Sequence, residues 1–111
     1  MKQTLEIRSY NLRPGTRPQF HAVVQSTVLP MLRRWGMDVV VCGPSRHDED
    51  SYFIMRSYEN LADRQARQDA FYGSEEWKAG PRAAIIAQIT GYTSIVIEVD
   101  APTLAGLRPV G

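Results

Sequence analysis

Residues 4–18 constrain the fold more than any other part of the chain. Residues 4–12 alternate in character, with Leu5 and Ile7 on one side and charged or aromatic residues on the other. Alternation with a period of two is typical of a β-strand whose two faces meet different surroundings. A Pro-Gly turn at residues 14–15 then leads into a helix. The pattern therefore predicts a sheet whose two faces have different roles.

The remaining chain predicts further strands and helices. Thr16 and Gln19 have the spacing of a capping box, and apolar residues then recur at helical spacing until a stop at Gly36. Pro30 lies inside this helix, where its missing N–H should cause a bend. Strand patterns cover residues 38–42, 51–58 and 92–99, and helical patterns cover residues 60–72, 74–79 and 82–89.

The predicted order is β-α-β-β-α-β, with the second helical region interrupted at Gly80-Pro81. This is the split-βαβ, ferredoxin-like plan, an α+β fold with an antiparallel four-stranded sheet. We assign residues 1–100 to this one domain, because a chain of 111 residues buries a single core. Residues 101–111 contain two prolines and two glycines and are predicted to be a loosely held C-terminal tail.

Composition argues against several classes of protein. The net charge is +1 and basic residues are spread among acidic ones, whereas a nucleic-acid partner requires a basic stripe. No apolar run approaches the roughly 20 residues that span a bilayer, so we expect no membrane partner. The single cysteine, Cys42, excludes an intramolecular disulfide and suits a reducing compartment. We therefore expect a cytoplasmic protein.

The two faces of the predicted sheet differ in chemistry. One face is apolar and is predicted to lie beneath the helices. It carries Leu5, Ile7, Val39, Val41, Phe53, Met55, Ile95 and Ile97. The opposite, mixed face carries Glu6, Arg8, Tyr10, Val40, Cys42, Ile54, Arg56, Tyr58, Val96 and Glu98. Because aliphatic and aromatic side chains on a sheet surface usually mark an interface or a cavity, we predict that this mixed face packs against a second copy in a two-fold homodimer.

Four motifs in this order resemble the NIPSNAP family. They are a Glu-x-Arg-x-Tyr strand with Pro-Gly within residues 5–15, a Leu-Pro helix ending in Gly at 28–36, a strand exit at 57–64, and Glu-Glu-Trp at 75–77. The resemblance implies the dimeric α/β-barrel superfamily, in which two four-stranded sheets close into a barrel with the helices outside. Relatives there include cofactor-independent monooxygenases, haem-degrading enzymes and isomerases, and fold membership does not choose among them. The Glu-Glu-Trp motif resembles part of a tryptophan-containing helix of the family, and Gly80-Pro81 interrupts that helix here. This departure implies a different ceiling for any pocket beneath it.

Candidate ligand-binding residues come from the mixed face and the helices beside it. Arg8 and Arg56 could hold a carboxylate or an enolate, because guanidinium groups form bidentate bonds with such groups. With Glu6 and Glu98 they could instead form a self-satisfied ion-pair network at the dimer interface, and the balance of two acids and two bases favours that interpretation. The predicted substrate-binding residues are Arg8, Tyr10, His21, Arg56, Tyr58 and Trp77.

His21 and Tyr10 are the candidate catalytic residues. A histidine can carry protons near neutral pH, although a histidine at a helix boundary more often bonds to the backbone. No motif predicts a cofactor or a metal site. Two functions stay open. One is a homodimer that binds a small organic ligand, with a cofactor-independent monooxygenase as its enzymatic form. The other is a non-catalytic binding or scaffolding homodimer.

Overall fold

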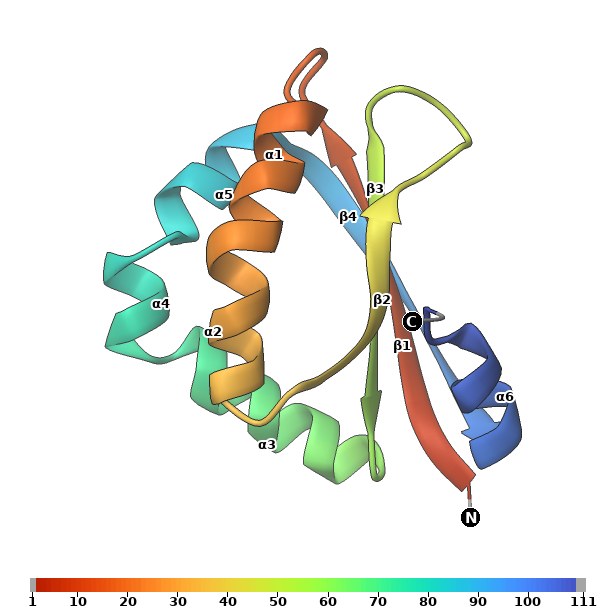
Figure 1. The fold of residues 1–111 in the computed structure, drawn as a ribbon. Helices are drawn as coiled ribbons and strands as arrows, with labels where there is room; N and C mark the ends of the chain where they lie inside the picture. Colours follow the sequence, from red (N-terminus) through yellow and green to blue (C-terminus); the bar gives the residue numbers. More distant parts are fainter. Residues whose placement is uncertain (1, 110–111) are drawn as a thin grey trace.

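The computed structural model describes residues 2–109, which form a four-stranded sheet with helices on both of its faces (Figure 1). The strands are β1 (Lys2–Leu12), β2 (Asp38–Pro44), β3 (Ser51–Tyr58) and β4 (Ile89–Asp100), in the order β2-β3-β1-β4. Each neighbouring pair is antiparallel, including the predicted hairpin of β2 and β3. The predicted ferredoxin-like α+β fold is confirmed.

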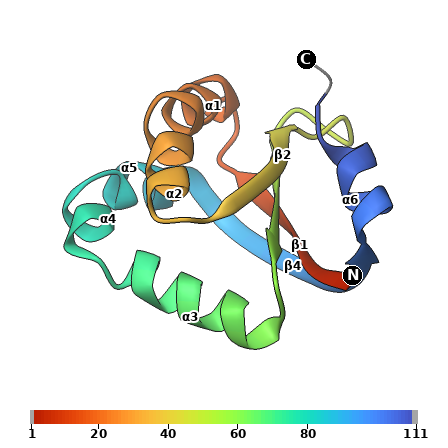
Figure 2. The same ribbon diagram turned by 60° about the horizontal axis from the view of Figure 1, so that its bottom comes forward.

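Most of the helices form one layer over the sheet. They are α1 (Arg17–Val23), the π-helical segment η1 (Val24–Val28), α2 (Leu29–Arg34), α3 (Leu61–Tyr72), α4 (Glu75–Ala79) and α5 (Arg82–Gln88). Figures 1 and 2 show that these segments lie on the same side of the sheet. We call the sheet surface beneath them the inner face and the opposite surface the outer face.

The first helix begins where the sequence predicts and changes its winding ahead of Pro30. Thr16 occupies the N-cap position, but its hydroxyl donates to the Arg13 carbonyl (2.8 Å), so the predicted capping box is wrong. In η1 the Leu29 N–H donates to the Val24 carbonyl, five residues earlier. The irregularity predicted at Pro30 thus takes the form of a π-turn, one of the ways in which a helix accommodates a lost hydrogen bond.

The inner face is the mixed face of the sheet, so the predicted assignment of faces was wrong. Tyr52 and Ile54 of β3 are 1% and 4% exposed and belong to one core with residues of α1, α2 and α3. From the apolar set that was predicted to lie beneath the helices, Leu5, Ile7, Val41 and Met55 pack on the outer face instead. The physical reason is the buried charge cluster around Glu6, which is described below.

β2 also departs from simple alternation. Its pairing with β3 shifts register between Val39 and Val41. Val39 packs against the inner core, whereas Val40 and Val41 both belong to the outer cluster. A bulge of this kind moves the following side chains to the other face of a strand, so the predicted faces of these valines were partly wrong.

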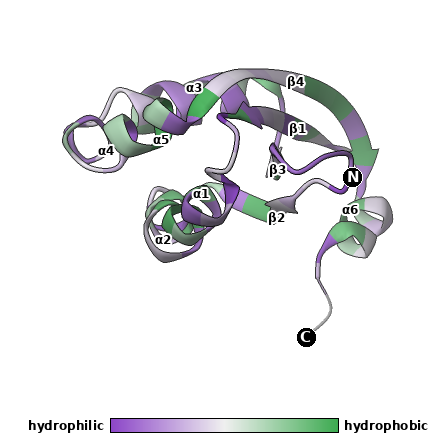
Figure 3. Ribbon diagram, turned by 90° about the horizontal axis from the view of Figure 1, so that it is seen from above, coloured by the Kyte–Doolittle hydropathy of each residue, from purple (hydrophilic) through white to green (hydrophobic). Residues whose placement is uncertain are grey.

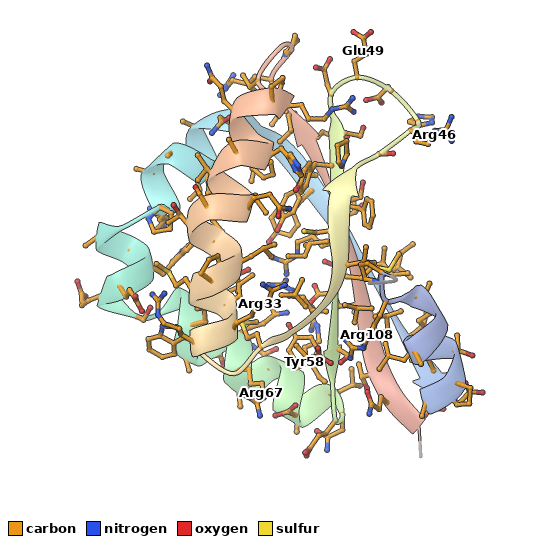
Figure 4. All side chains as sticks on the ribbon, viewed as in Figure 1. Arg33, Arg46, Glu49, Tyr58, Arg67 and Arg108 are labelled. Atoms are coloured by element: carbon orange, nitrogen blue, oxygen red, sulfur yellow. The ribbon has the colours of Figure 1, made fainter. Side chains whose placement is uncertain are left out.

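The C-terminal segment is a docked helix rather than the predicted loose tail. Residues Ala101–Leu107 form α6, whose N-cap Asp100 accepts a hydrogen bond from the Thr103 N–H (2.8 Å). Leu104 is 4% exposed and packs on the outer face. Arg108 follows α6 and pairs with Asp38 of β2 through two hydrogen bonds of 2.6 and 3.0 Å (Figure 4). The end of the predicted tail, residues 110–111, lies outside the described residues.

α6 leaves part of the outer face uncovered. Ile95 and Ile97 of β4 are 60% and 42% exposed, and Figure 3 shows the hydrophobic stretch of β4 to which they belong. Within residues 2–109, no helix combines the length and the hydropathy that crossing a membrane would need.

Candidate ligand pocket and its buried charge cluster

Glu6 is the centre of a buried charge cluster on the inner face. Its side chain is fully buried, at 0% exposed. Its carboxylate accepts hydrogen bonds from Arg8 Nη2 (2.9 Å), Arg56 Nη2 (3.3 Å), Arg64 Nη2 (3.1 Å), Gln68 Nε2 (2.5 Å) and Ser94 Oγ (2.8 Å). We call these residues, with Glu6, the Glu6 cluster. They come from β1, β3, β4 and α3, so the cluster ties α3 to three strands of the sheet.

The Glu6 cluster explains why charged residues can lie beneath the helices. Burial alone would raise the pKa of Glu6, but the hydrogen bond from Arg64 and the charges of Arg56 and Arg8 lower it from 4.5 to about 2. Glu6 is therefore ionised, and its partners replace the water that it loses on burial. Three guanidinium groups and one carboxylate leave the cluster with a net charge of +2.

The structure brings together three of the four charged residues that the sequence predicts to converge. Glu6, Arg8 and Arg56 meet on the inner face within a single chain, so this network is complete without the second copy that the prediction assumed. Glu98 lies outside the cluster, on an exposed part of β4 opposite Thr4. Arg64 of α3 joins the cluster, and the sequence analysis missed it. The predicted balance of two acids and two bases is therefore wrong.

A polar stripe on α3 supplies the members of the site that were missed. Arg64, Gln68 and Tyr72 recur at intervals of four residues, which places them on one face of a helix. Arg64 and Gln68 donate hydrogen bonds to Glu6, and the Tyr72 hydroxyl accepts one from Arg56. A search for apolar periodicity overlooks this stripe, and its four-residue spacing is the signal that could have found it.

A pocket of about 760 Å³ lies between the sheet and the helices α3, α4 and α5. Its lining residues are Arg8, Tyr10, Gln68, Tyr72, Trp77, Lys78, Arg82, Ile85, Ile86, Ile89 and Tyr92. The sheet side is aromatic and charged, with the guanidinium of Arg8 4.8 Å from the ring centroid of Tyr92. The α5 side combines Ile85 and Ile86 with Arg82. A ligand in this space would meet aromatic and aliphatic walls together with several charged and polar side chains.

Tyr72 and Trp77 form the aromatic corner of the pocket. Their rings meet edge to face, with centroids 5.3 Å apart. The Tyr72 hydroxyl accepts a hydrogen bond from Arg56 Nη1 (2.8 Å) and lies 3.5 Å from Arg8 Nη1. A second cavity of about 30 Å³, enough for roughly one water molecule, lies behind this corner and is lined in part by Arg56 and Tyr72.

The predicted substrate-binding residues divide between the pocket and its surroundings. Arg8, Tyr10 and Trp77 line the pocket, and Arg56 lies behind it in the wall of the smaller cavity. His21 and Tyr58 are not among the lining residues. His21 Nδ1 instead lies 2.7 Å from the Tyr52 hydroxyl, and Tyr58 accepts a hydrogen bond from Gln68 (3.2 Å).

Tyr10 keeps its proton over a wide pH range. Burial and the neighbouring Tyr72 raise the pKa of Tyr10 to about 12. It therefore offers the pocket a neutral phenol that can donate or accept a hydrogen bond. Within residues 2–109, no group of three or more His, Cys, Asp and Glu side chains is arranged to hold a metal ion.

The fold and the pocket define a ferredoxin-like α+β protein with a cavity between its sheet and its helical layer. The family model for NIPSNAP matches residues 5–97. The chain therefore belongs to the NIPSNAP family. No functionally curated protein matches it by sequence.

Solved structures show the same fold at low sequence identity. An uncharacterised NIPSNAP domain protein from Burkholderia xenovorans is 20% identical, with a TM-score of 0.76 over 88% of this chain and 95% of that one. A NIPSNAP family protein of unknown function from Agrobacterium tumefaciens is 18% identical, with a TM-score of 0.80 over 87% of each chain. A Nitrosomonas europaea protein provisionally assigned as an antibiotic biosynthesis monooxygenase is 11% identical, with a TM-score of 0.68 over 90% of this chain and 92% of that one.

Proposed function

We propose that this protein binds a small organic molecule in the pocket between the sheet and α3, α4 and α5. The observation that carries the proposal is the pocket itself, whose volume of about 760 Å³ suits a ligand of drug-like size. Arg8 and Tyr72 supply polar groups, and Trp77 and Ile85 supply apolar surface. Charged, aromatic and aliphatic groups converging on one cavity are typical of a ligand site.

We further propose that the protein works as a homodimer that is packed through its outer faces. The sequence analysis assigned the dimer contact to the mixed face, but that face lies beneath the helices. Exposed Ile95 and Ile97 make the outer face the better candidate, because burying an isoleucine contributes roughly 1.5–3 kcal/mol. The resemblance to the dimeric α/β-barrel superfamily supports a second copy as the occupant. The pocket lies on the opposite side of the sheet, so dimer formation and ligand binding are compatible.

The variant Ile86→Trp tests the pocket. Ile86 lines the pocket and is 48% exposed, so a larger side chain can fill the space without straining the core. In an NMR screen of planar aromatic compounds, we expect wild-type protein to show shifts at the Trp77 indole. We expect Ile86→Trp to bind the same compounds at least about ten-fold more weakly.

The matched control is Leu61→Trp, because Leu61 is 64% exposed on α3 and does not line the pocket. This variant should bind like wild type. Compounds that bind equally well to Ile86→Trp would occupy another site and would contradict the proposal. A screen that yields no ligand at all would also count against it.

A cofactor-independent monooxygenase is the enzymatic form of this proposal. The similarity in fold to the N. europaea protein supports it. The candidate proton carrier His21 lies outside the pocket lining, so the hydroxyl groups placed to meet a substrate are those of Tyr10, Tyr72 and Tyr92. Oxygen uptake in the presence of an enolisable polycyclic ketone, reduced in Ile86→Trp, would favour the enzyme. Binding of the ketone without oxygen uptake would favour the non-catalytic alternative.

A further inference from the structure

Tyr72 has a hydroxyl proton that no described residue accepts. Its oxygen meets Arg56 Nη1 at 2.8 Å and Arg8 Nη1 at 3.5 Å. Because an arginine side chain carries only donors, the phenol oxygen is the acceptor in both contacts. The O–H of Tyr72 therefore stays free to donate, and within residues 2–109 no oxygen accepts it. Since Tyr72 lines the pocket, a ligand can use this donor.

The surroundings of this hydroxyl are positively charged. Arg8, Lys78 and Arg82 line the pocket, and the described lining includes no aspartate or glutamate. Arg8 belongs to the Glu6 cluster, whose net charge of +2 includes its own guanidinium. Arg56 is 1% exposed, and its Nε is a buried donor without a partner. Guanidinium and ammonium groups focused on one cavity favour an anion, and most of all an oxygen anion that accepts their hydrogen bonds.

The remaining walls favour a flat apolar body. Tyr92 and Tyr10 lie side by side, with ring centroids 6.1 Å apart. Trp77 closes the aromatic corner, and Ile85 and Ile86 face it from α5. Aromatic rings pack well on such surfaces, so these walls favour a ligand whose apolar part is flat.

We propose that the pocket takes a planar, apolar molecule with a conjugated oxygen anion, and that the Tyr72 hydroxyl donates a hydrogen bond to this oxygen. The proposal rests on the proposed ligand-binding function and names its chemical class. Arg8 stabilises the same oxygen by its charge from the sheet side. Lys78 and Arg82 attract the anion from α4 and α5. A carboxylate and an enolate or phenolate share this chemistry, and the probes below separate them.

Two matched pairs of probes test the proposal in calorimetric titrations of the full chain. The first pair is 2-naphthoate and the neutral 2-naphthylmethanol, and the second is 2-hydroxy-1,4-naphthoquinone as its enolate and the neutral methyl ether of that compound. We expect at least one anion to bind about ten-fold or more tightly than its neutral partner, since hydrogen bonds to charged groups are the strong ones. A preference only in the first pair identifies a carboxylate, and a preference only in the second identifies an enolate.

The variant Tyr72→Phe removes the proposed donor and leaves the ring in place. We expect the preferred anion to bind about ten-fold more weakly and its neutral partner to change less than about three-fold. Tyr52→Phe is the matched control, because Tyr52 is also a buried tyrosine but does not line the pocket, and its hydroxyl contacts His21 rather than a lining residue. It should keep the affinity and the anion preference of the wild type.

A second variant keeps the test decisive if loss of the Tyr72 hydroxyl destabilises the fold. Arg82 is exposed and lines the pocket, so Arg82→Gln should weaken anion binding several-fold, with a smaller effect at high salt. Arg46→Gln makes the same charge change on the loop between β2 and β3 (Figure 4) and should leave binding unchanged.

The outcomes separate this inference from the proposed function. The anion proposal would be overturned if the neutral probes bound as tightly as the anions. If those neutral probes also bound more weakly to Ile86→Trp, the result would still support a ligand pocket. An anion preference that survives both Tyr72→Phe and Arg82→Gln would overturn the assignment of these residues. If no probe binds to the wild-type protein, both proposals fail.

Discussion

Glu6 shows how one side chain can decide which face of a sheet is covered. An alternating strand with leucine and isoleucine on one side should place that side beneath the helices. Here the opposite side is covered, because a fully buried carboxylate gathers donors from three strands and from α3. Each of those hydrogen bonds is accepted by the charged carboxylate, and together they replace the hydration that Glu6 loses on burial.

The pKa of Glu6 predicts a specific loss of stability in acid. The folded chain keeps Glu6 ionised down to about pH 2, whereas an ordinary glutamate takes up a proton near 4.5. Unfolding therefore binds a proton between these values, so the contribution of Glu6 is complete above pH 4.5 and is lost as pH falls towards 2. The shift corresponds to about 3 kcal/mol in the free energy of unfolding. Urea titrations from neutral pH to the acid limit measure it.

Glu6→Gln should remove this part of the pH dependence and should be less stable by about 3–5 kcal/mol at neutral pH, because it leaves the buried Arg8 and Arg56 and the half-buried Arg64 without a counter-charge. Glu49→Gln is the matched control, since it makes the same change on an exposed loop (Figure 4). An acid slope that is equal in wild type and Glu6→Gln would show that Glu6 is not its source.

At the scale of elements, the pocket depends on how α4 is held. Glu76 of α4 accepts hydrogen bonds from Trp35 Nε1 (2.7 Å) and from Arg34 Nη2, which attaches α4 to the end of α2. Trp77 and Lys78 of the pocket belong to the same short helix. Gly80 then turns the chain into α5, at the point where the sequence departs from the family pattern. The ceiling of the pocket is therefore fixed from both ends of α4.

Gly80→Ala should disturb this ceiling. A Cβ at residue 80 would lie 2.5 Å from the Glu76 carbonyl oxygen, closer than any ordinary contact, so α4 has to move. We expect a loss of about 1–3 kcal/mol in stability, as for other overpacked sites, and weaker binding of pocket ligands because Trp77 shifts with α4. Gly91→Ala is the control, because nothing lies within 4 Å of its added Cβ. Thermal unfolding that is the same for both variants would contradict this account.

The order and type of the helices and strands could be predicted from sequence, but the face of the sheet that the helices cover could not. Alternation on β1, helical spacing before Gly36 and the breaks at Gly73 and Gly80 are local signals that survive folding. The Glu6 cluster depends on residues as far apart as Glu6 and Ser94, and no local pattern indicates that they meet. α6 was missed because Pro102 and Gly106 suggest a loop, while its stability comes from Leu104, which packs in the outer cluster with Val40 of the distant strand β2.

At the scale of the whole molecule, the sheet separates two surfaces with different proposed tasks. The inner face holds the charge cluster and the pocket, and the outer face presents aliphatic side chains that α6 covers only in part. Exposed isoleucines on a broad sheet surface are costly in water, which is the physical basis for the proposed dimer.

Ile95→Glu should separate the proposed dimer into monomers. Ile95 is 60% exposed on the outer face, so the substitution strains nothing within one protomer but places a charge in the contact between two. Light scattering at micromolar concentration should give the mass of two chains for wild type and of one chain for Ile95→Glu. Leu61→Glu, on α3, should remain dimeric. A wild-type mass of one chain would contradict the proposed dimer.

The unequal composition of the Glu6 cluster sets a limit on how this protein can evolve. Replacing any one of the three arginines by a neutral residue brings the buried charge closer to zero, whereas replacing the acid moves it further away. On charge alone, the chain therefore tolerates the loss of Arg64, which lines neither cavity, better than the loss of Glu6. In a lineage of such chains, position 64 should change before position 6.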